Sequence, residues 1–438
     1  MDNYSNWRNM KYKMRILCLV EKTNIPNYVL DLSLIFAIIF NSNSVWALEK
    51  EQFSLSCFIL LSVSFIYYTL TSCYAKEVIR CTIVPILVVM SATLMIQLVV
   101  SFVHGAEGLW DGTWFQYTLI LPMLLGCLLN RGKKYVYSIL LPRVVNVSVL
   151  LCFIGIVLWI LSNFMFFPPT STTILMWSEI GKIDSYYGLL YKIQPFVING
   201  MQIYRNTSIF PEAPMAAVFY GITFFVSLVL LRNKDIVKNS ILCVGLLTSF
   251  STSAYIYIIF TLLAYFLCSI DYSKKDNKIV LSIVPVIILF LFAFVIELIS
   301  NKINNSSSGM THFFDFVQGF RIWGDAPVFG FGFESDEFIW QNYLSAFRGG
   351  LGYTSGMLFL AIHGGIISLL CVFIPLILWV INPISKAAKY FVVYMLIIFT
   401  TTVVQNCGIF ILCLSLGYAN FIWKKNDIKE RMQCAVLE

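Results

Sequence analysis

Residues 205–231 read RNTSIFPEAPMAAVFYGITFFVSLVLL, a polar segment that runs directly into an apolar one. The apolar part, from Met215 to Leu231, carries no charge and is long enough to enter the hydrocarbon core of a bilayer as a helix. Pro214 suits the first turn of such a helix, where a backbone N–H has no intrahelical partner. The junction therefore predicts an extramembrane loop that ends where a membrane span begins.

The composition extends this interpretation to the whole chain. Of the 438 residues, 59% are hydrophobic and only 12% are charged, which lies outside the usual range of soluble globular proteins. We therefore predict an all-α polytopic membrane protein, a single integral membrane domain over residues 1–438. Apolar runs of roughly 17 to 25 residues give eight clear spans. They lie near 28–46, 53–74, 81–103, 113–129, 144–167, 213–231, 279–300 and 354–380.

Two further apolar runs are too long or too interrupted for one helix. The run 238–270 is broken by the polar residues 248–253, and the run 389–423 is broken near Gln405 and Asn406. We predict that each forms two short helices, which gives about 12 transmembrane helices. The split also places every cluster of lysine and arginine in short loops on the cytoplasmic side, as the positive-inside rule expects.

This topology predicts a cytoplasmic N-terminus (1–27), a cytoplasmic tail (424–438) and two large external loops, at 168–212 and 301–353. The first apolar run is expected to act as a signal anchor. Lysine and arginine that serve as topology signals account for the net charge of +7, so no nucleic-acid partner is expected. Neither long loop contains cysteine, which argues against disulfides and cysteine-ligated metals there.

Long loops in compact proteins tend to be functional, so we expect the site there. In the first loop, Arg205 is a candidate for binding a phosphate or diphosphate, because its planar fork pairs well with phosphate oxygens. A phospholipid headgroup contact is the alternative for this residue. Glu212 falls at the start of the next helix, where the helix dipole favours a negative charge, so it is either a cap or a catalytic carboxylate.

In the second loop, Arg321 lies among Phe316, Phe320 and Trp323. Such aromatic side chains either stack on sugar rings or anchor the chain at the membrane interface. Arg348, within a glycine-rich segment, is either a second phosphate contact or an interfacial anchor.

The remaining candidates for site residues are three acidic residues and two histidines. Glu334, Asp336 and Glu337 are expected to form a solvated loop face rather than a cation site. His312 could act as a base, whereas His363, inside a predicted span, is expected to pack and form hydrogen bonds within the bundle. The chain has no Walker loop, dinucleotide fingerprint or Asp-x-Asp motif, which argues against a nucleotide-sugar donor.

On these residues the chain resembles the Wzy-type polysaccharide polymerases and the related WaaL-type O-antigen ligases, over about residues 150–380. The first-loop pattern of the family, Arg-x-x-Gly-x-Phe-x-Glu-Pro, is similar to Arg205, Phe210 and Glu212 here. Ser208 stands where glycine is usual, and Ala213 is inserted before the proline. Arg321 followed by Gly332 is similar to the second-loop Arg-x10-Gly pattern, and residues 249–254 look like the serine-rich turn of the family.

The resemblance implies a metal-independent glycosyltransferase without a cofactor, in the bacterial cytoplasmic membrane. It would join undecaprenyl-diphosphate-linked oligosaccharide repeat units, which serve as donor and acceptor, on the outer face of that membrane. It would make O-antigen or capsule, with a chain-length regulator and a flippase as partners. The implied catalytic residues are Arg205, Glu212 and Arg321, and Phe210 and Gly332 match the family's motifs. Together with Arg348, Trp323 and His312, which the loop residues themselves suggest, Phe210 and Gly332 are the candidate substrate-binding residues.

Two alternatives remain open from the sequence. An O-antigen ligase would transfer the glycan to lipid A-core instead of to another repeat unit. A lipid-linked glycan flippase or transporter would carry charges near the middle of its spans and often shows repeated halves. Here the predicted spans carry few charges near their middle, since Asp31 and Glu297 lie near span ends, and the predicted external loops contain Arg205, Arg321 and Arg348, which favours an enzyme.

Overall fold

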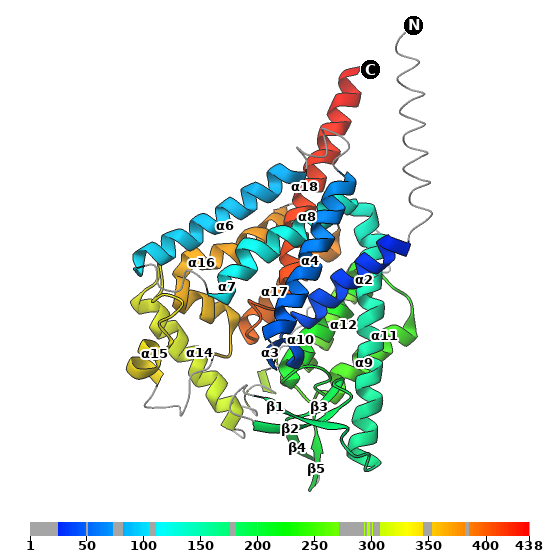
Figure 1. Cartoon of the computed structure of the whole chain (residues 1–438), viewed down its shortest axis with the longest axis vertical. Helices are drawn as coiled ribbons and strands as arrows, with labels where there is room; N and C mark the ends of the chain where they lie inside the picture. The colour runs from blue at the N-terminus through cyan, green and yellow to red at the C-terminus, as the bar shows by residue number, and fades with distance from the viewer. Residues whose placement is uncertain are drawn as a thin grey trace.

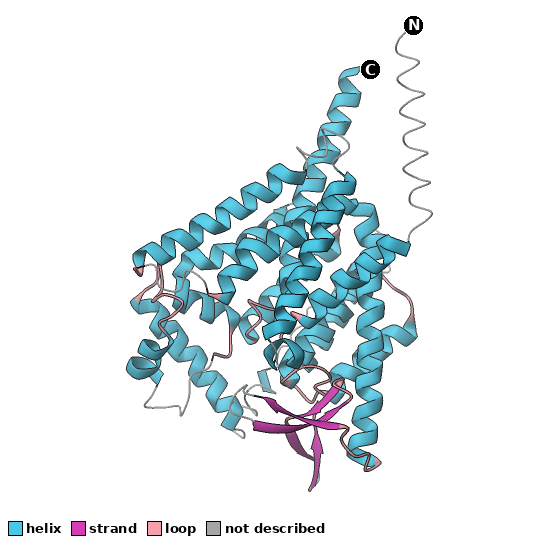
Figure 2. Ribbon diagram, viewed as in Figure 1, coloured by secondary structure: helices cyan, strands magenta, loops and turns pink. Residues whose placement is uncertain are grey.

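The structure, a computed structural model, describes residues 25–49, 51–72, 82–105, 111–175, 181–198, 200–270, 307–344, 353–381 and 385–437, with 293, 296, 297 and 300. Helices form most of the chain, and a small group of strands lies at one end of the helical body (Figure 2). Helices α14 and α15 lie on the same side of the body as the strands, away from the end of α18 (Figure 1). Parts of the two predicted external loops thus lie on one side of the bundle.

The helices of the first half follow the predicted apolar runs. They are α2 (Ile25–Phe40), α3 (Val45–Glu49), α4 (Glu51–Ser72), α6 (Val84–Val103), α7 (Gly112–Phe115), α8 (Leu121–Tyr135) and α9 (Leu141–Phe164). Two π-helical turns, Gln116–Ile120 and Val136–Leu140, join α7 to α8 and α8 to α9. Gly132 has a φ of 75° and a ψ of 158°, so the helical direction changes there.

The helices of the second half show both of the breaks that the sequence predicted. They are α10 (Ala213–Phe225), extended by a π-helical turn to Leu230, α11 (Ile236–Thr248), α12 (Thr252–Ser269), α14 (Ser307–Asp325), α15 (Asp336–Ile339), α16 (Gly356–Ile381), α17 (Lys386–Thr401) and α18 (Gly408–Leu437). A π-helical turn, Trp340–Leu344, follows α15. At the first break, the Asn206 N–H donates to the Thr248 carbonyl (3.0 Å), and at the second the Gly356 N–H donates to the Thr402 carbonyl (3.0 Å). Neighbouring segments thus satisfy the backbone groups that each break frees.

Five helical segments among the described residues are long and apolar enough to cross a membrane. They are Val84–Val103, Gly112–Phe164, Ala213–Leu230, Thr252–Ser269 and Gly356–Ile381. Shorter apolar helices lie at Asn27–Phe40, Ser56–Thr69 and Ile236–Thr248. The protein is therefore a mostly helical membrane protein, while a total of about 12 spans stays a prediction. The predicted span 279–300 lies outside the described residues except for four single positions.

The first long loop, for which the sequence predicted no secondary structure, contains five short strands. Strands β1 (Ser171–Leu175), β2 (Gly181–Tyr186) and β3 (Leu190–Lys192) form an antiparallel sheet in that order. Strands β4 (Pro195–Ile198) and β5 (Met201–Tyr204) pair antiparallel, with Phe196 opposite Ile203. The strands are anchored on the end of α9, because Trp159 Nε1 donates to the Tyr204 carbonyl (2.6 Å) and Asn163 Oδ1 accepts from the Tyr204 N–H (2.8 Å). The loop is therefore a folded unit held against a membrane helix.

Helix α10 is the most enclosed of the candidate spans. In its most apolar part, 83% of the residues are buried within the protein, against 33% for α6 and for α12. Its aromatic side chains pack on neighbouring helices, for example Phe225 on Tyr394 with ring centroids 4.7 Å apart. The polar segment that precedes α10 is therefore attached to the interior of the bundle.

Helix α16 is interrupted at Gly365, which has a φ of 62° and a ψ of −163°. The segment 327–332 of the second loop pairs with the helix on both sides of this interruption. Phe331 N–H donates to the Ile362 carbonyl (2.8 Å), and Ile366 N–H donates to the Pro327 carbonyl (2.9 Å). A break in an apolar helix is stable only where other groups take up its free N–H and C=O groups, and here loop backbone does so.

This pairing predicts the effect of adding a methyl group at Gly365. A Cβ there would lie 2.1 Å from the Val328 carbonyl oxygen, and the φ is one that side chains rarely adopt. We expect Gly365→Ala to destabilise the protein by about 2 kcal/mol or more and to lower its thermal unfolding temperature.

The matched control is Gly324→Ala, because a Cβ at Gly324 would meet nothing within 4 Å. Its unfolding temperature should stay close to that of the wild type. Equal unfolding temperatures for Gly365→Ala and the wild type would show that the pairing does not constrain the break.

Candidate functional site

Arg205 follows strand β5 directly, and its guanidinium is half-buried. Its backbone N–H donates to the Gln194 carbonyl (3.0 Å), and its guanidinium carbon lies 5.1 Å from the centroid of the Phe196 ring. The Nε atom is buried and has no hydrogen-bond partner. Burial lowers the pKa of Arg205, and the nearby Tyr255 offsets part of this effect. A half-buried cation of this kind gains from an anion that replaces the water it has lost.

Buried side chains pack against the inner side of the turn before α10. Ser208 has a φ of 49°, its N–H donates to Asn206 Oδ1 (3.2 Å), and its hydroxyl accepts from the Tyr220 O–H (2.8 Å). The family pattern has glycine at this position, and a left-handed φ is the physical reason to favour glycine there. The ring of Phe210 is fully buried and lies 6.1 Å from that of Tyr220. Phe210 therefore supports the turn from the inside.

Glu212 is the N-terminal capping residue of α10 and is half-buried. Its backbone is extended, and its carbonyl accepts from the N–H groups of Met215 and Ala216 (both 3.1 Å). Although Arg205 and Glu212 are both described, their side chains do not form an ion pair with each other. The backbone of Glu212 is thus fixed at the start of a buried helix, close to the turn that carries Arg205.

Gln194 connects the two ends of this turn. Its backbone carbonyl accepts from the Arg205 N–H, and its side-chain Oε1 accepts from the Ala213 N–H (3.1 Å). Nothing in the sequence analysis pointed to Gln194, because its role depends on the position of strand β4 relative to α10. It is a positioning residue that holds Arg205 near the start of α10.

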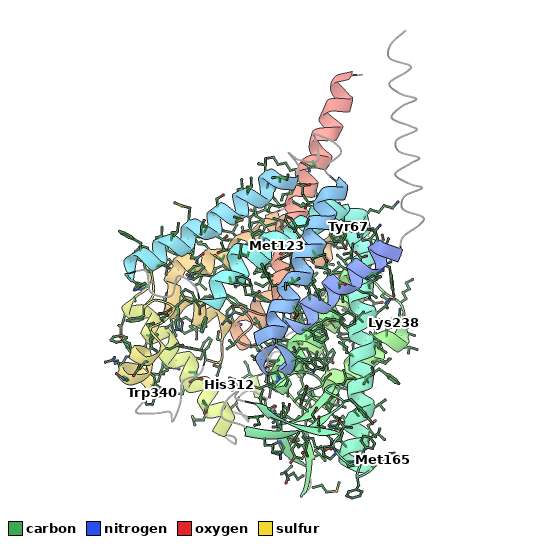
Figure 3. All side chains as sticks on the ribbon, viewed as in Figure 1. Tyr67, Met123, Met165, Lys238, His312 and Trp340 are labelled. Atoms are coloured by element: carbon green, nitrogen blue, oxygen red, sulfur yellow. The ribbon has the colours of Figure 1, made fainter. Side chains whose placement is uncertain are left out.

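In the second loop, α14 carries Arg321, whose side chain is exposed. Trp323 is half-buried, its Nε1 donates to the Pro327 carbonyl (3.0 Å), and its ring lies 6.1 Å from that of Phe320. His312 lies on the part of α14 that is nearer to the strands in the view of Figure 3. Arg321 and the neighbouring Phe320 ring therefore lie on the exposed face of α14.

Gly332 is buried, with a φ of 94°. Its N–H donates to the His363 carbonyl (2.8 Å), and a Cβ at this position would lie 3.1 Å from Cγ of His104. His104 Nε2 donates in turn to the Phe329 carbonyl (3.3 Å). The positive φ and the close approach of the His104 ring therefore explain a glycine at position 332. In this structure the Gly332 N–H pairs with a carbonyl next to the break of α16.

A polar cluster lies where the second loop meets this break. The ring of His363 is fully buried, and its Nε2 lies 2.9 Å from Oδ1 of Asp336. The Tyr353 hydroxyl donates to the same Asp336 oxygen (3.0 Å) and lies 3.3 Å from His363 Nε2. The three side chains come from α15, the segment before α16, and α16 itself. They join the start of α15 to the membrane helix.

Two acceptors face the ring of His363. Nδ1 lies 2.9 Å from the Phe359 carbonyl, which can only accept, so Nδ1 donates. Nε2 lies 2.9 Å from the Asp336 carboxylate. Burial raises the pKa of Asp336, but the hydrogen bonds and charge of His363, with the hydrogen bond of Tyr353, outweigh it and hold that pKa below its usual value. We therefore interpret His363 and Asp336 as an ion pair.

The structure corrects one prediction about the acidic residues and adds a residue that the sequence analysis missed. Glu334 and Glu337 are exposed, as expected, whereas Asp336 is only partly exposed and is paired with His363. The predicted hydrogen-bonding role of His363 is confirmed. Tyr353 was not predicted, because only the fold brings it to residues 17 and 10 positions away.

The candidate residues are only partly brought together. Arg205, Phe210 and Glu212 share one turn, and Arg321, Trp323 and Gly332 share the second loop. Between these two groups, the described residues show no direct hydrogen bond or ion pair. Arg348 lies outside the described residues. A scan against protein-family models and a search of curated proteins found no match for the chain.

The pair of Asp336 and His363 predicts how stability depends on pH. A carboxyl group whose pKa is lowered by folding stabilises the protein above its unfolded pKa of about 4, and this contribution is lost as the pH falls through the folded pKa. At neutral pH, Asp336→Asn should lower the free energy of unfolding by about 1 kcal/mol, a value that allows for the partial exposure of Asp336.

Thermal unfolding of the purified protein at several pH values tests this expectation. The difference between the wild type and Asp336→Asn should shrink below about pH 4, because the wild-type carboxyl is then protonated as well. Glu334→Gln is the control and should have little effect throughout the pH range. A difference that stays constant with pH would contradict the ion pair.

Proposed function

We propose that this protein is a polysaccharide polymerase of the cytoplasmic membrane of a bacterium. In this proposal it joins oligosaccharide repeat units carried on undecaprenyl diphosphate, at the outer face of the membrane, without metal or cofactor. One lipid-linked glycan is the donor and a second is the acceptor. The proposal includes about 12 spans, with both termini in the cytoplasm.

The observation that carries the proposal is the environment of Arg205. A permanently charged group that is half-buried, stacked near Phe196 and left with an unpartnered Nε is suited to binding an anion. Because Glu212 does not pair with it, the charge of Arg205 is not neutralised by its nearest acidic neighbour in the sequence. A diphosphate brings two phosphate groups, and the planar guanidinium can hold their oxygens through two parallel hydrogen bonds.

The geometry of the turn supports the resemblance on which the substrate class depends. Ser208 has the left-handed backbone that makes glycine usual at this position, and Glu212 occupies the N-cap position of the helix that follows. The resemblance also places a second arginine in the other loop. Here Arg321 is exposed on α14. Helix α14 as a whole lies on the same side of the bundle as the strands of the first loop (Figure 1).

The reaction follows from these roles. A hydroxyl of the acceptor glycan attacks the anomeric carbon of the donor, a new glycosidic C–O bond forms, and the bond between that carbon and the diphosphate breaks. Arg205, joined by Arg321 when substrate is bound, stabilises the negative charge that develops on the leaving diphosphate. Glu212, at the start of α10, accepts the proton of the attacking hydroxyl.

Arginine substitutions test the proposal in cells. Arg205→Ala and Arg321→Ala should each reduce the amount of long-chain polysaccharide by roughly 100-fold, the usual effect of removing one electrostatic contact to a transition state. Arg205→Lys should also lose most activity, because lysine lacks the planar fork. The measurement is the length distribution of surface polysaccharide on a gel, with the amount of protein in the membrane measured in parallel.

Lys182→Ala is the matched control, since Lys182 is an exposed cation on β2 of the same loop. It should leave the distribution unchanged. Normal long chains in both arginine variants would contradict the proposed roles. In a deletion strain, single repeat units attached to their acceptor indicate a polymerase, whereas a complete loss of attached glycan indicates a ligase or a flippase.

A further inference from the structure

A second charged cluster lies away from the long loops, around Asp31 of α2. The side chain of Asp31 is buried, and its Oδ1 accepts from the Tyr68 hydroxyl (2.6 Å) and from Nη2 of Arg131 (3.2 Å). Its Oδ2 accepts from the Tyr135 hydroxyl and from Nη1 of Arg143. The cluster thus joins α2, α4, α8 and α9 through a single carboxylate.

The charges of this cluster do not cancel. Two guanidinium groups face one carboxylate, and the tyrosines act as neutral donors, so the cluster of described residues has an excess of one positive charge. The side chains of Arg131 and Arg143 are only 14% and 27% exposed, so water compensates this excess poorly. An additional anion would therefore be stabilised here.

Arg131 also has unused hydrogen-bonding capacity. Its Nε is buried without a hydrogen-bond partner. Its guanidinium carbon lies 3.9 Å from the ring centroid of Tyr68 and 4.6 Å from that of Tyr135, and that of Arg143 lies 4.7 Å from the Tyr28 ring. Aromatic faces attract a cation but carry no net charge, so they hold the arginines in place without neutralising them.

The position of the cluster indicates which anion is available. Arg143 lies in the first turn of α9, and the strands of the first loop pack on the other end of the same helix. Met165 lies 22 residues after Arg143, a rise of roughly 33 Å at 1.5 Å per residue, close to the hydrocarbon thickness of a bilayer. Because this segment is long and apolar enough to cross a membrane, we infer that the cluster lies at the membrane surface opposite to the first loop, at the depth of lipid headgroups. In Figure 3, Tyr67, the neighbour of Tyr68, lies far from Met165, in agreement with this placement.

We propose that this cluster binds the headgroup phosphate of an anionic phospholipid. Basic sites between transmembrane helices at a membrane surface are suited to such headgroups. A headgroup with one net negative charge matches the excess of one positive charge, whereas a zwitterionic headgroup brings its own cation to an already cationic site. The proposal is independent of the function proposed for the long loops.

Purified protein in lipid nanodiscs provides the test. We expect wild-type protein to retain phosphatidylglycerol roughly fivefold better than phosphatidylcholine, as measured by mass spectrometry of the bound lipid, in line with about 1 kcal/mol per basic residue near an anionic surface. Arg143→Gln removes the excess charge and should abolish most of this preference. Lys238→Gln is the matched control, because Lys238 is a half-buried cation paired with Asp235, outside the cluster, and it should keep the preference.

Two results would overturn the proposal. Equal retention of both lipids by the wild type would show that the cluster serves only to hold the helices together, and this measurement needs no variant. Protection of the wild type from thermal unfolding by inorganic phosphate, equal to that by phosphatidylglycerol at the same concentration, would indicate a site for free anions instead. Should Arg143→Gln fail to fold, Arg143→Lys, which keeps the charge, should retain most of the preference.

Discussion

The position of the second loop depends on the break in α16, because the backbone groups that the break leaves unpaired require partners. A membrane helix interrupted at Gly365 would leave backbone N–H and C=O groups unpaired in apolar surroundings, at a cost of several kcal/mol for each group. The segment 327–332 supplies the missing partners on both sides of the break. This pairing fixes where the loop meets the bundle, and the ion pair of Asp336 with His363 adds a second attachment at the same place.

The first loop is likewise attached to a membrane helix by hydrogen bonds to its backbone. Its strands pack on the end of α9, and the Asn206 N–H donates to the last carbonyl of α11. Gln194 accepts hydrogen bonds from both ends of the turn that carries Arg205. The turn continues into α10, the most enclosed of the candidate spans. A half-buried arginine is therefore presented by rigid elements, which is the arrangement that binding a charged leaving group requires.

Much of the helical pattern could be predicted from the sequence, because apolar length and polar interruptions are local properties. The breaks at residues 248–253 and near Gln405 are examples, and both are confirmed. The strands of the first loop could not be predicted, since they are short and depend on packing against α9. The contact of Asp336 with His363 joins residues 27 positions apart, and no spacing rule points to it.

Binding of the lipid to purified protein shows whether Arg205 holds the diphosphate of the lipid-linked substrate, as we propose. Affinity for undecaprenyl diphosphate should fall at least tenfold in Arg205→Ala, the loss expected for a charge-assisted hydrogen bond of about 1.5 to 3 kcal/mol. Lys182→Ala should bind as the wild type does. Equal affinity of the wild type and Arg205→Ala for this lipid would contradict the account.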